Sequence, residues 1–447
     1  MPQVFMGGLN KVVTILVGGA TLVGLSLQPA RAQITVAVRN DANLLGGATV
    51  LKKFRAGFVG DGSGERIVFR GTVRDTTGSV QGVFRSDDTG SGSSIAERDG
   101  VAPGGSTYRN FLQPSINSTG DVAWYGFLGD GRSGIFRIVG GDPSASRRVF
   151  DTGAIAPISP GTYEFTDFDA PEITDSGGVV FWGEAESTMS STRLEGVFIC
   201  EGGNGDCVAG TAAPFALVST GDAIPGGGGR LVCEFDRAVR ASTYGVAFRA
   251  QTRTNCNSLT EASLDGVFRI DFSGANGLEL IALAGGATDL GGVATYQLFR
   301  EAPTIEDDGL VAFTANLSSG PINEAVFLCD PADGCPGIAA ESIVRKSDIV
   351  PIVNDELRNF AAPQIADNGD VVFTARPRDG TGRGPSIYIR RYAGGTVERI
   401  VTGSSFGPLG TIFKRIGAHH TSPSGTVIFR ATVSGAATWR TGLFLWQ

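Results

Sequence analysis

The sequence contains little of what helical proteins and many catalytic sites are built from. It has only two histidines and three methionines. No segment after the N-terminus sustains a 3.6-residue apolar periodicity, so a helical fold is excluded. There is no CxxC pair, no Gly-x-Ser-x-Gly elbow, no Walker loop and no His-Glu-x-x-His motif. We therefore predict no metal site, no catalytic residue and no cofactor.

The two histidines, His419 and His420, are adjacent. Neighbouring residues of a strand point to opposite faces, so the pair does not readily share one metal ion. Acidic turns such as Glu306 to Gly309 and Asp61 to Glu65 lack the twelve-residue spacing of a calcium-binding EF-hand. We interpret the histidines as structural and the acidic residues as hairpin turns.

The chain has no excess of basic residues, and its net charge is −8. This excludes the electrostatic signature of nucleic-acid binding. Its one long apolar stretch, Val12 to Leu27, follows Lys11 and precedes an Ala30-Arg31-Ala32 cleavage pattern. We predict a signal peptide over 1–32 and a mature chain of 33–447 with a net charge of about −10. That chain would be secreted or periplasmic, monomeric and without a membrane span.

Six cysteines in an exported chain favour disulfides, although six allow fifteen pairings. Two pairs enclose short loops, and the third is nearly symmetrical about a turn near Tyr244. The preferred pairs are Cys200–Cys207, Cys329–Cys335 and Cys233–Cys256.

Glycine is abundant, with 66 residues, and short Val/Ile/Phe runs alternate with polar turns. The segment from Ala302 to Ala315 shows the unit: a short strand, a polar turn ending in glycine and a strongly apolar second strand. Seven copies of the second strand occur, and a third strand such as Gly266-Val267-Phe268-Arg269 follows each one. The aromatic residues that mark the seven copies are Phe69, Trp124, Phe181, Phe248, Phe313, Phe373 and Phe429. This periodicity is typical of an all-β repeat fold.

The seventh repeat stops at Gln447, directly after its third strand. Its missing fourth strand has a counterpart at the other end of the mature chain, in Ile34 to Val38. We therefore predict one domain, 33–447, folded as a seven-bladed β-propeller of four-stranded antiparallel blades. The N-terminal strand would complete the last blade and close the ring.

The geometry of the repeat accounts for the glycines and prolines at fixed positions. Glycine takes a positive φ at no steric cost, and we predict it to close the turn at positions 120, 177, 309, 369 and 425. Proline occurs in the first strand of four repeats, at positions 114, 171, 303 and 363. Because proline cannot donate a ladder hydrogen bond, these sites should be unpaired or bulged.

One turn, Asn117-Ser-Thr-Gly120-Asp-Val-Ala-Trp124, resembles the NxxGxxxAF tandem repeat of exported bacterial proteins that carry varying C-terminal anchors. The other copies have threonine, glutamate, alanine or serine in place of the asparagine. The resemblance extends over nearly all of residues 34–447. It implies an exported, propeller-like repeat protein of unknown activity, and it carries no catalytic residues over to this chain.

The loops between second and third strands vary most in sequence and should emerge on one face of the ring, together with the connections between blades. Variable polar loops on a rigid scaffold are where binding usually occurs. Solvated loop surface is the alternative interpretation. The candidate binding residues are Arg74, Asp75, Glu184, Glu186, Asp265, Glu324, Arg376 and Arg378, with Glu261 and Asp379 in the same loops.

We expect a non-enzymatic binding scaffold of the bacterial envelope or extracellular space, whose partner is an extracellular protein or a glycan. The alternative is a propeller hydrolase or lyase acting on glycans or lactones, and a structural surface-layer role is a third possibility. Acidic residues from two blades meeting at the centre of the ring would favour the enzyme. A centre lined by Gly, Ser and Arg would favour binding. Fold alone does not decide.

Overall fold

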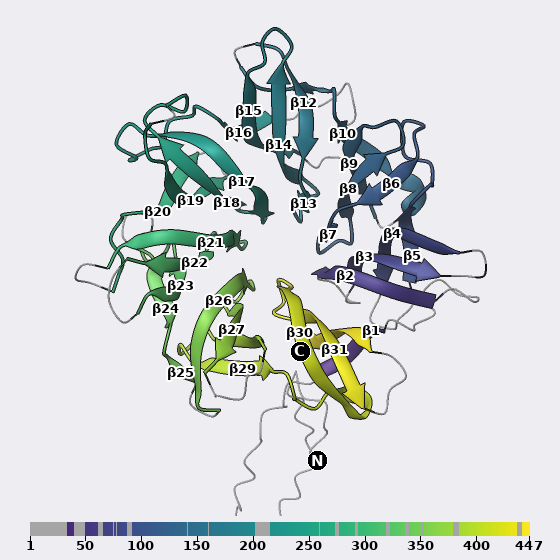
Figure 1. Ribbon diagram of the computed structural model, residues 1–447, viewed down its shortest axis with the longest axis vertical. Coiled ribbons are helices and arrows are strands. Elements are labelled where there is room, and N and C mark those ends of the chain that lie inside the picture. The colour runs from purple at the N-terminus through teal and green to yellow at the C-terminus, as the bar shows by residue number, and fades with distance from the viewer. Residues whose placement is uncertain are drawn as a thin grey trace, which may run out of the picture. The chain divides into compact units, whose positions relative to one another are not determined.

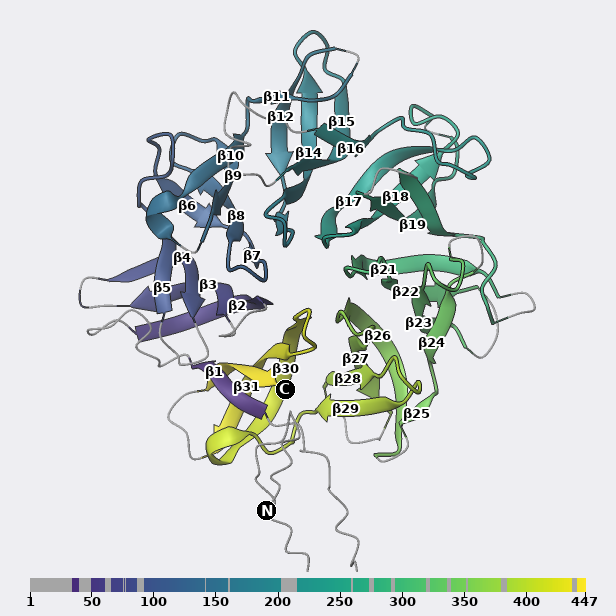
Figure 2. The same ribbon diagram turned by 180° about the vertical axis from the view of Figure 1, so that it is seen from behind.

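The chain forms seven small antiparallel sheets arranged as the blades of a β-propeller (Figures 1 and 2). The computed structural model describes residues 34–39, 50–60, 66–74, 76, 78–86, 92–140, 142–159, 161–201, 215–258, 260–272, 277–290, 294–318, 322–335, 339–350, 353–378, 384–435 and 440–447. No α-helix occurs among these residues. The predicted signal peptide, 1–32, lies outside them.

Blades 1 to 3 follow one another along the first half of the chain. Blade 1 contains β2 (Val50–Gly60), β3 (Arg66–Arg74), β4 (Ser79–Ser86) and β5 (Gly92–Glu97). Blade 2 contains β6 (Tyr108–Phe111), β7 (Ser115–Ile116), β8 (Val122–Leu128), β9 (Ser133–Ile138) and β10 (Arg147–Asp151), with a 3-10 turn at Pro143–Ala145. Blade 3 contains β11 (Ile155–Ala156), β12 (Tyr163–Phe168), β13 (Glu172–Ile173), β14 (Val179–Ser187), β15 (Arg193–Cys200) and β16 (Phe215–Ser219).

Blades 4 to 7 complete the ring. Blade 4 contains β17 (Leu231–Ala241), β18 (Gly245–Arg253), β19 (Leu264–Asp271) and β20 (Leu278–Leu283). Blade 5 contains β21 (Tyr296–Ile305), β22 (Val311–Leu317), β23 (Glu324–Cys329) and β24 (Glu341–Arg345). Blade 6 contains β25 (Ile349–Val350), β26 (Asp355–Ile365), β27 (Val371–Pro377), β28 (Ser386–Arg390) and β29 (Val397–Val401). Blade 7 contains β30 (Thr411–Thr421), β31 (Val427–Gly435), β32 (Thr441–Trp446) and β1 (Ile34–Arg39), with a 3-10 turn at Pro408–Gly410.

The predicted closure of the ring is confirmed. β1 pairs antiparallel with β32, with Ile34 opposite Trp446 and Thr35 opposite Leu445. The last sheet therefore has the order β1-β32-β31-β30, in which the first described strand of the chain is the outermost one.

Three blades depart from the predicted four strands. The first strand of blades 2 and 3 is split in two, into β6 and β7 around Pro114 and into β12 and β13 around Pro171. The short strands β11 and β25 pair with the first strands of blades 3 and 6, β12 and β26. The splits arise because proline has no N–H for the ladder. Pro303 and Pro363 likewise lie where the register of the first strand shifts.

The core repeats one aromatic pair in every blade. The marker aromatic of the second strand lies directly opposite an aromatic residue of the third, as Phe313 does opposite Phe327 at a ring-centroid distance of 5.4 Å. The other six pairs are Phe69–Phe84, Trp124–Phe136, Phe181–Phe198, Phe248–Phe268, Phe373–Tyr388 and Phe429–Phe444. All fourteen side chains are at most 1% exposed. Each such pair contributes about 0.5–1.5 kcal/mol beyond its buried area.

The ring has two distinct faces. We call the face with the turns between first and second strands the turn face. The opposite face, with the loops between second and third strands and the connections between blades, is the loop face. The five predicted glycines of the turn face all have positive φ, from 78° to 88°.

Neighbouring turns of the turn face are hydrogen-bonded to each other. The amide of Ser118 donates to Asp175 Oδ1 at 2.7 Å, and in the same way Thr243 donates to Asp307 Oδ1 at 2.8 Å. Asn117 Nδ2 also donates to the Thr174 carbonyl at 2.9 Å. These contacts join blade 2 to blade 3 and blade 4 to blade 5.

In four blades the side chain that opens the turn accepts a hydrogen bond from the amide four residues further on. Asn117 Oδ1 accepts from Asp121 at 2.8 Å, Thr174 Oγ1 from Gly178 at 2.9 Å and Glu306 Oε1 from Leu310 at 3.0 Å. Asparagine, threonine and glutamate thus all serve as the acceptor in these turns. Ala366, which opens the turn of blade 6, has no side-chain acceptor, and that turn is held by backbone hydrogen bonds.

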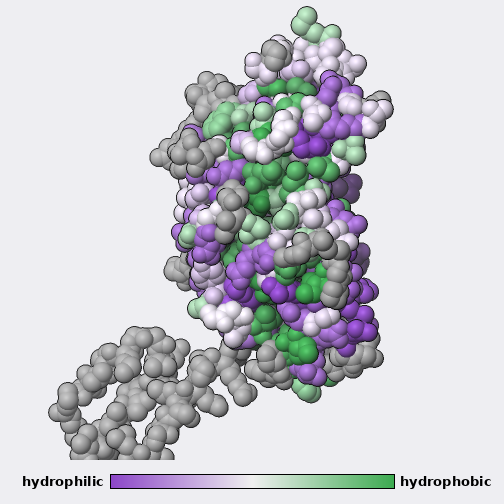
Figure 3. All heavy atoms as spheres, turned by 90° about the vertical axis from the view of Figure 1, so that its left-hand side faces the viewer, coloured by the Kyte–Doolittle hydropathy of each residue, from purple (hydrophilic) through white to green (hydrophobic). Residues whose placement is uncertain are grey.

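Two predicted disulfides are confirmed, Cys233–Cys256 and Cys329–Cys335. The third predicted pair includes Cys207, which lies outside the described residues. Figure 3 shows the rim of the ring on the side of β20 and β24, where hydrophobic side chains lie in patches among hydrophilic ones. The described residues include no helix of the length and hydropathy needed to span a membrane.

Candidate functional site

The first strands of the blades lie nearest the centre of the ring, and each is interrupted part-way along (Figure 1). β6/β7 and β12/β13 break at a proline. In β17, β21, β26 and β30 the register with the second strand shifts instead, for example between Phe235 and Val239. The interruptions carry the backbone away from a regular ladder at the same level in successive blades.

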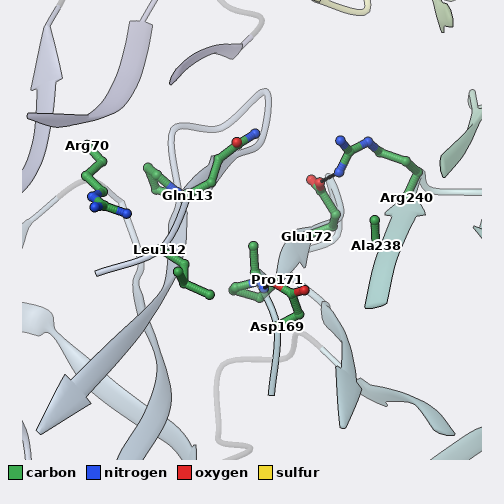
Figure 4. A pocket seen from close by; sticks show the side chains of 10 residues that line it. Arg70, Leu112, Gln113, Asp169, Pro171, Glu172, Ala238 and Arg240 are labelled. Carbon is green, nitrogen blue, oxygen red and sulfur yellow. Dashed lines mark hydrogen bonds and ion pairs between the residues drawn. The ribbon is translucent and has the colours of Figure 1, made fainter. Parts of the chain in front are cut away.

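At this level lies a cavity of about 330 Å³, which we call the central cavity (Figure 4). Blades 1 to 4 all contribute to it. Its polar lining residues are Arg70, Gln113, Asp169, Glu172 and Arg240. Its apolar lining residues are Leu112, Pro114, Ala170, Pro171 and Ala238. The volume is at the lower end of the range for small-molecule sites.

Glu172 and Arg240 form an ion pair across the boundary between blades 3 and 4 (Figure 4). Their side chains are 14% and 27% exposed. Burial raises the pKa of the Glu172 carboxyl, and the Arg240 guanidinium limits the rise by favouring the charged form. The two charges satisfy one another and form one wall of the central cavity.

Asp169 and Gln113 have unused hydrogen-bonding capacity. Burial raises the pKa of Asp169, and the neighbouring Asp167 and Asp236 raise it further, against the amide of Ala170 and the charge of Arg237. Asp169 accepts one hydrogen bond, from Ala170 N at 2.6 Å. Gln113 is half-buried, and its amide makes no hydrogen bond within the part of the chain that the structure describes.

Polar side chains of the first strands form a ring that includes Glu172 and Arg240 of the central cavity. They occupy one register position, two residues before the turn, and each faces a small or aliphatic residue of the second strand. The members are Ser115, Glu172, Arg240, Thr304, Gln364 and His420, opposite Ala123, Val180, Ala247, Ala312, Val372 and Ile428. Ser115, Thr304 and Gln364 are at most 9% exposed, whereas the other three members are partly exposed.

His420 belongs to that ring. Burial, followed by the positive charge of Arg240, lowers the pKa of His420 to about 3. Arg240 lies in blade 4 and His420 in blade 7, so the charge acts across the centre rather than between neighbours. In the described part of the chain, no three His, Cys, Asp or Glu side chains form a group that could hold a metal ion.

The predicted loop-face residues lie on five blades and are not brought together. Glu184 and Glu186 are on β14, where both contact Arg193 at 3.3 and 3.2 Å. Arg378 pairs with Glu356 at 3.2 Å, and Arg376 is exposed. Arg74 ends β3, and Asp75 lies outside the described residues.

Asp265 and Glu324 connect blades. Both stand at the start of a third strand and accept backbone amides from the first strand of the next blade. Glu324, 4% exposed, accepts from Asn359 and Phe360, each at 2.9 Å. Asp265 accepts from Phe299 at 3.3 Å. Glu195 does the same for Phe235 at 2.8 Å, so the contact recurs at three successive blade boundaries.

Sequence reasoning did not identify the lining of the central cavity, because its residues come from four repeats and none lies in a variable loop. One signal was present. Pro114 and Pro171 marked the interruptions of the first strands, and Gln113, Asp169 and Glu172 lie within two residues of them.

Comparison with known proteins shows the family. A model described as "Family of unknown function (DUF7453)" matches residues 21–217 and, a second time, residues 215–447. The chain belongs to this family. Two successive matches of one model show that the two halves of this DUF7453 chain resemble each other, as expected of a repeat fold. No curated protein matches the chain.

Several solved structures are similar to this DUF7453 chain at low identity. The polysaccharide lyase Uly1 has 11% identity and a TM-score of 0.41, over 92% of this chain and 90% of that one. The acylaminoacyl peptidase of Pyrococcus horikoshii has 10% identity and a TM-score of 0.47, over 88% of this chain and 51% of that one, about half its length. The six-bladed Aleuria aurantia lectin, with its fucose recognition mode, has 10% identity and a TM-score of 0.31, over 79% of this chain and 95% of that one. Similarity at this level carries no argument about function.

Proposed function

We propose that this chain is an exported, non-enzymatic binding scaffold and that its ligand is a small polar molecule held in the central cavity. The observation that supports this most directly is the convergence of polar side chains from four blades on one cavity of about 330 Å³. A rigid scaffold with a few polar groups among apolar walls is how small-molecule sites are commonly built.

The proposal includes the setting of the protein. A signal peptide over 1–32 directs a mature, single-domain monomer, 33–447, to the periplasm or the extracellular space. Two disulfides support an oxidising compartment. Membership of the NxxGxxxAF repeat group, with a protein or glycan partner on the loop face, is part of the same proposal. N-terminal sequencing of the exported chain tests it, with Gln33 as the expected first residue.

The ligand-binding part is tested by filling the cavity. Ala238→Phe places a ring into the central cavity, whereas Ala223→Phe adds the same ring to an exposed connection between blades. We expect Ala238→Phe to abolish binding of a small ligand found by thermal-shift screening, and Ala223→Phe to bind as the unsubstituted chain does. Equal binding by both variants would place the ligand elsewhere.

One observation favours the alternative, a hydrolase or lyase acting on glycans or lactones. Carboxylates from two blades, Asp167 and Asp169 of blade 3 and Asp236 of blade 4, lie close enough for their charges to raise the pKa of Asp169. However, Asp167 pairs with Arg237 at 2.9 Å and Asp236 with Arg249 at 2.6 Å, which leaves no second carboxylate free for paired acid and base chemistry. Release of reducing ends or opening of lactones by the chain, lost in Asp169→Asn, would establish the enzyme instead.

A further inference from the structure

On the turn face, the residue that opens a turn also receives a contact from the preceding blade. We call it the turn-opening residue. The Thr174 carbonyl accepts the amide of the turn glycine, Gly177, at 2.8 Å and a second hydrogen bond from Asn117 Nδ2 at 2.9 Å. In the same way the Glu306 carbonyl accepts from Ser242 Oγ at 2.9 Å. At these two blade boundaries, one turn-opening side chain therefore donates to the carbonyl of the next turn-opening residue.

The boundary between blades 5 and 6 has the same arrangement except for one proton. Its turn-opening residues are Glu306 and Ala366. The Ala366 carbonyl accepts the amide of Gly369 at 2.7 Å and receives no second hydrogen bond from the described part of the chain. Glu306 Oε1 accepts the amide of Leu310, four residues further on, as Asn117 Oδ1 does in its own turn. Glu306 Oε2 therefore corresponds to Asn117 Nδ2, but a carboxyl oxygen can donate only when it is protonated.

Glu306 Oε2 is also out of reach of water. The residue is 4% exposed, and the Oε2 atom is buried and has no hydrogen-bond partner among the described residues. A charged oxygen buried without a donor is costly, whereas a neutral carboxyl can donate to a carbonyl. The burial of this atom therefore favours the protonated form, whose hydroxyl has the Ala366 carbonyl as its acceptor.

The charges around Glu306 act in the same direction. The charged or titratable groups that face its turn within the described residues are Asp307 and Asp308 beside it, Asp367 of the blade 6 turn, and Tyr244 and Arg269 of blade 4. Arg269 is already paired with Glu279. Burial, and after it the negative charges of Asp308 and Asp367, raise the pKa of Glu306 to about 7, against the backbone amides that Oε1 accepts.

We propose that Glu306 is a pH-sensitive latch between blades 5 and 6, whose protonated Oε2 donates to the Ala366 carbonyl and whose ionisation breaks this contact. The proton that is released goes to the solvent. The latch is closed in acid and opens as the pH rises through about 7, because the folded state binds the proton more tightly than the unfolded state does. Asn117 and Ser242 do not titrate, so the boundaries that they serve stay closed. The latch lies on the turn face and acts independently of any ligand in the central cavity.

The test is hydrogen–deuterium exchange of the full chain, measured by mass spectrometry at about pH 5.5 and about pH 8.5 and corrected for the chemical exchange rate at each pH. The probe is the peptide that contains Gly369, whose amide donates to Ala366. The internal control is the peptide that contains Gly177, at the boundary that Asn117 serves. We expect protection of the blade 6 turn to fall about tenfold between the two pH values, and protection of the blade 3 turn to stay constant.

Three variants sharpen the test. Glu306→Gln supplies a permanent donor and acceptor, as Asn117 does, so its blade 6 turn should keep the acid-state protection at about pH 8.5. Asp308→Asn removes a neighbouring negative charge, which makes Glu306 easier to ionise, so protection should be lost at a lower pH. Glu341→Gln alters a side chain of blade 5 that is 61% exposed and should leave the pH profile unchanged.

Three results would overturn the latch. A loss of protection confined to the turn of blade 5 would show that Glu306 titrates without contacting blade 6. A loss that persists in Glu306→Gln would assign the titration to another group. Constant protection of both turns would show that Glu306 does not titrate in this range. Asp308→Asn alters an exposed residue, so its shifted profile decides the question even if Glu306→Gln does not fold.

Discussion

Glu324 provides the sharpest test of how neighbouring blades are held together. Its buried carboxylate accepts the backbone amides of Asn359 and Phe360 in the first strand of blade 6. It also lies 3.2 Å from Arg300 Nη1, whose side chain is 41% exposed. Glu324→Ala removes all three interactions without altering an exposed surface.

The magnitude follows from what is left without a partner. Phe360 is 1% exposed, so its amide loses an acceptor that water cannot replace, at a cost of about 1–3 kcal/mol. Asn359 is exposed, so its amide can donate to water instead. The ion pair with Arg300 contributes at most about 1 kcal/mol because the arginine is solvated. We expect a loss of about 1–4 kcal/mol in the free energy of unfolding. For a chain of this length, about 1 kcal/mol corresponds to about 1 °C in Tm.

Differential scanning calorimetry of three equivalent variants checks the reasoning. Glu195→Ala removes one amide contact of 2.8 Å, and Asp265→Ala removes one of 3.3 Å. The losses should therefore rank Glu324 first, Glu195 second and Asp265 third. Glu341→Ala, at a side chain that is 61% exposed, is the control and should stay within about 0.5 kcal/mol. A Glu324 variant as stable as this control, or a reversed ranking, would refute the argument.

Three further outcomes are expected. Burial raises the pKa of Glu306 to about 7, so between about pH 4.5 and 7 the folded state holds a proton that the unfolded state has released. The stability that depends on this proton is fully present below about pH 4.5 and is lost as the pH rises through 7. Glu306→Gln should therefore stabilise the chain by about 1–3 kcal/mol at pH 8 and hardly at all at pH 4.5, as urea titrations at both pH values would show. Gly309→Ala combines a φ of 83° with a Cβ only 2.7 Å from the Tyr244 ring, and should cost about 3–5 kcal/mol in the same titrations, against about 1–2 for Gly153→Ala, where φ is 90° but the space is open. Ser404→Gly relieves a φ of 81° and should add about 0.5–1 kcal/mol; a decrease in Tm would contradict the assignment of strain.

The architecture could be predicted because short sequence patterns indicate its strands, its turns and its repeats. The seven marker aromatic residues indicated seven blades, and the apolar run at Ile34 to Val38 indicated the strand that closes the last one. Turn glycines followed from backbone sterics alone. The extra strands β11 and β25 could not be predicted, because two paired residues leave no periodicity to detect.

The central cavity could not be predicted because it depends on juxtaposition. Asp169 and Arg240 are separated by 71 positions in the sequence and meet only when four interrupted first strands converge. Asp265 and Glu324, by contrast, are residues that the sequence did single out. A charged residue beside a variable loop indicates binding when only the sequence is read, whereas in the structure its carboxylate serves the backbone of the neighbouring blade.

The pairing of β1 with β32 determines the order in which the molecule can be completed. The chain is synthesised from its N-terminus, so β1 stays without its partner until residue 446 has emerged. Contacts so distant in sequence form slowly, because the entropy of closing the intervening loop must be lost first. Blades 1 to 6 can assemble meanwhile, but blade 7 cannot. Until the two strands pair, β1 has an unpaired edge, and so does β32 once it has emerged, and such edges are templates for pairing with other chains. The last step of folding is therefore also the step that removes the main hazard of aggregation.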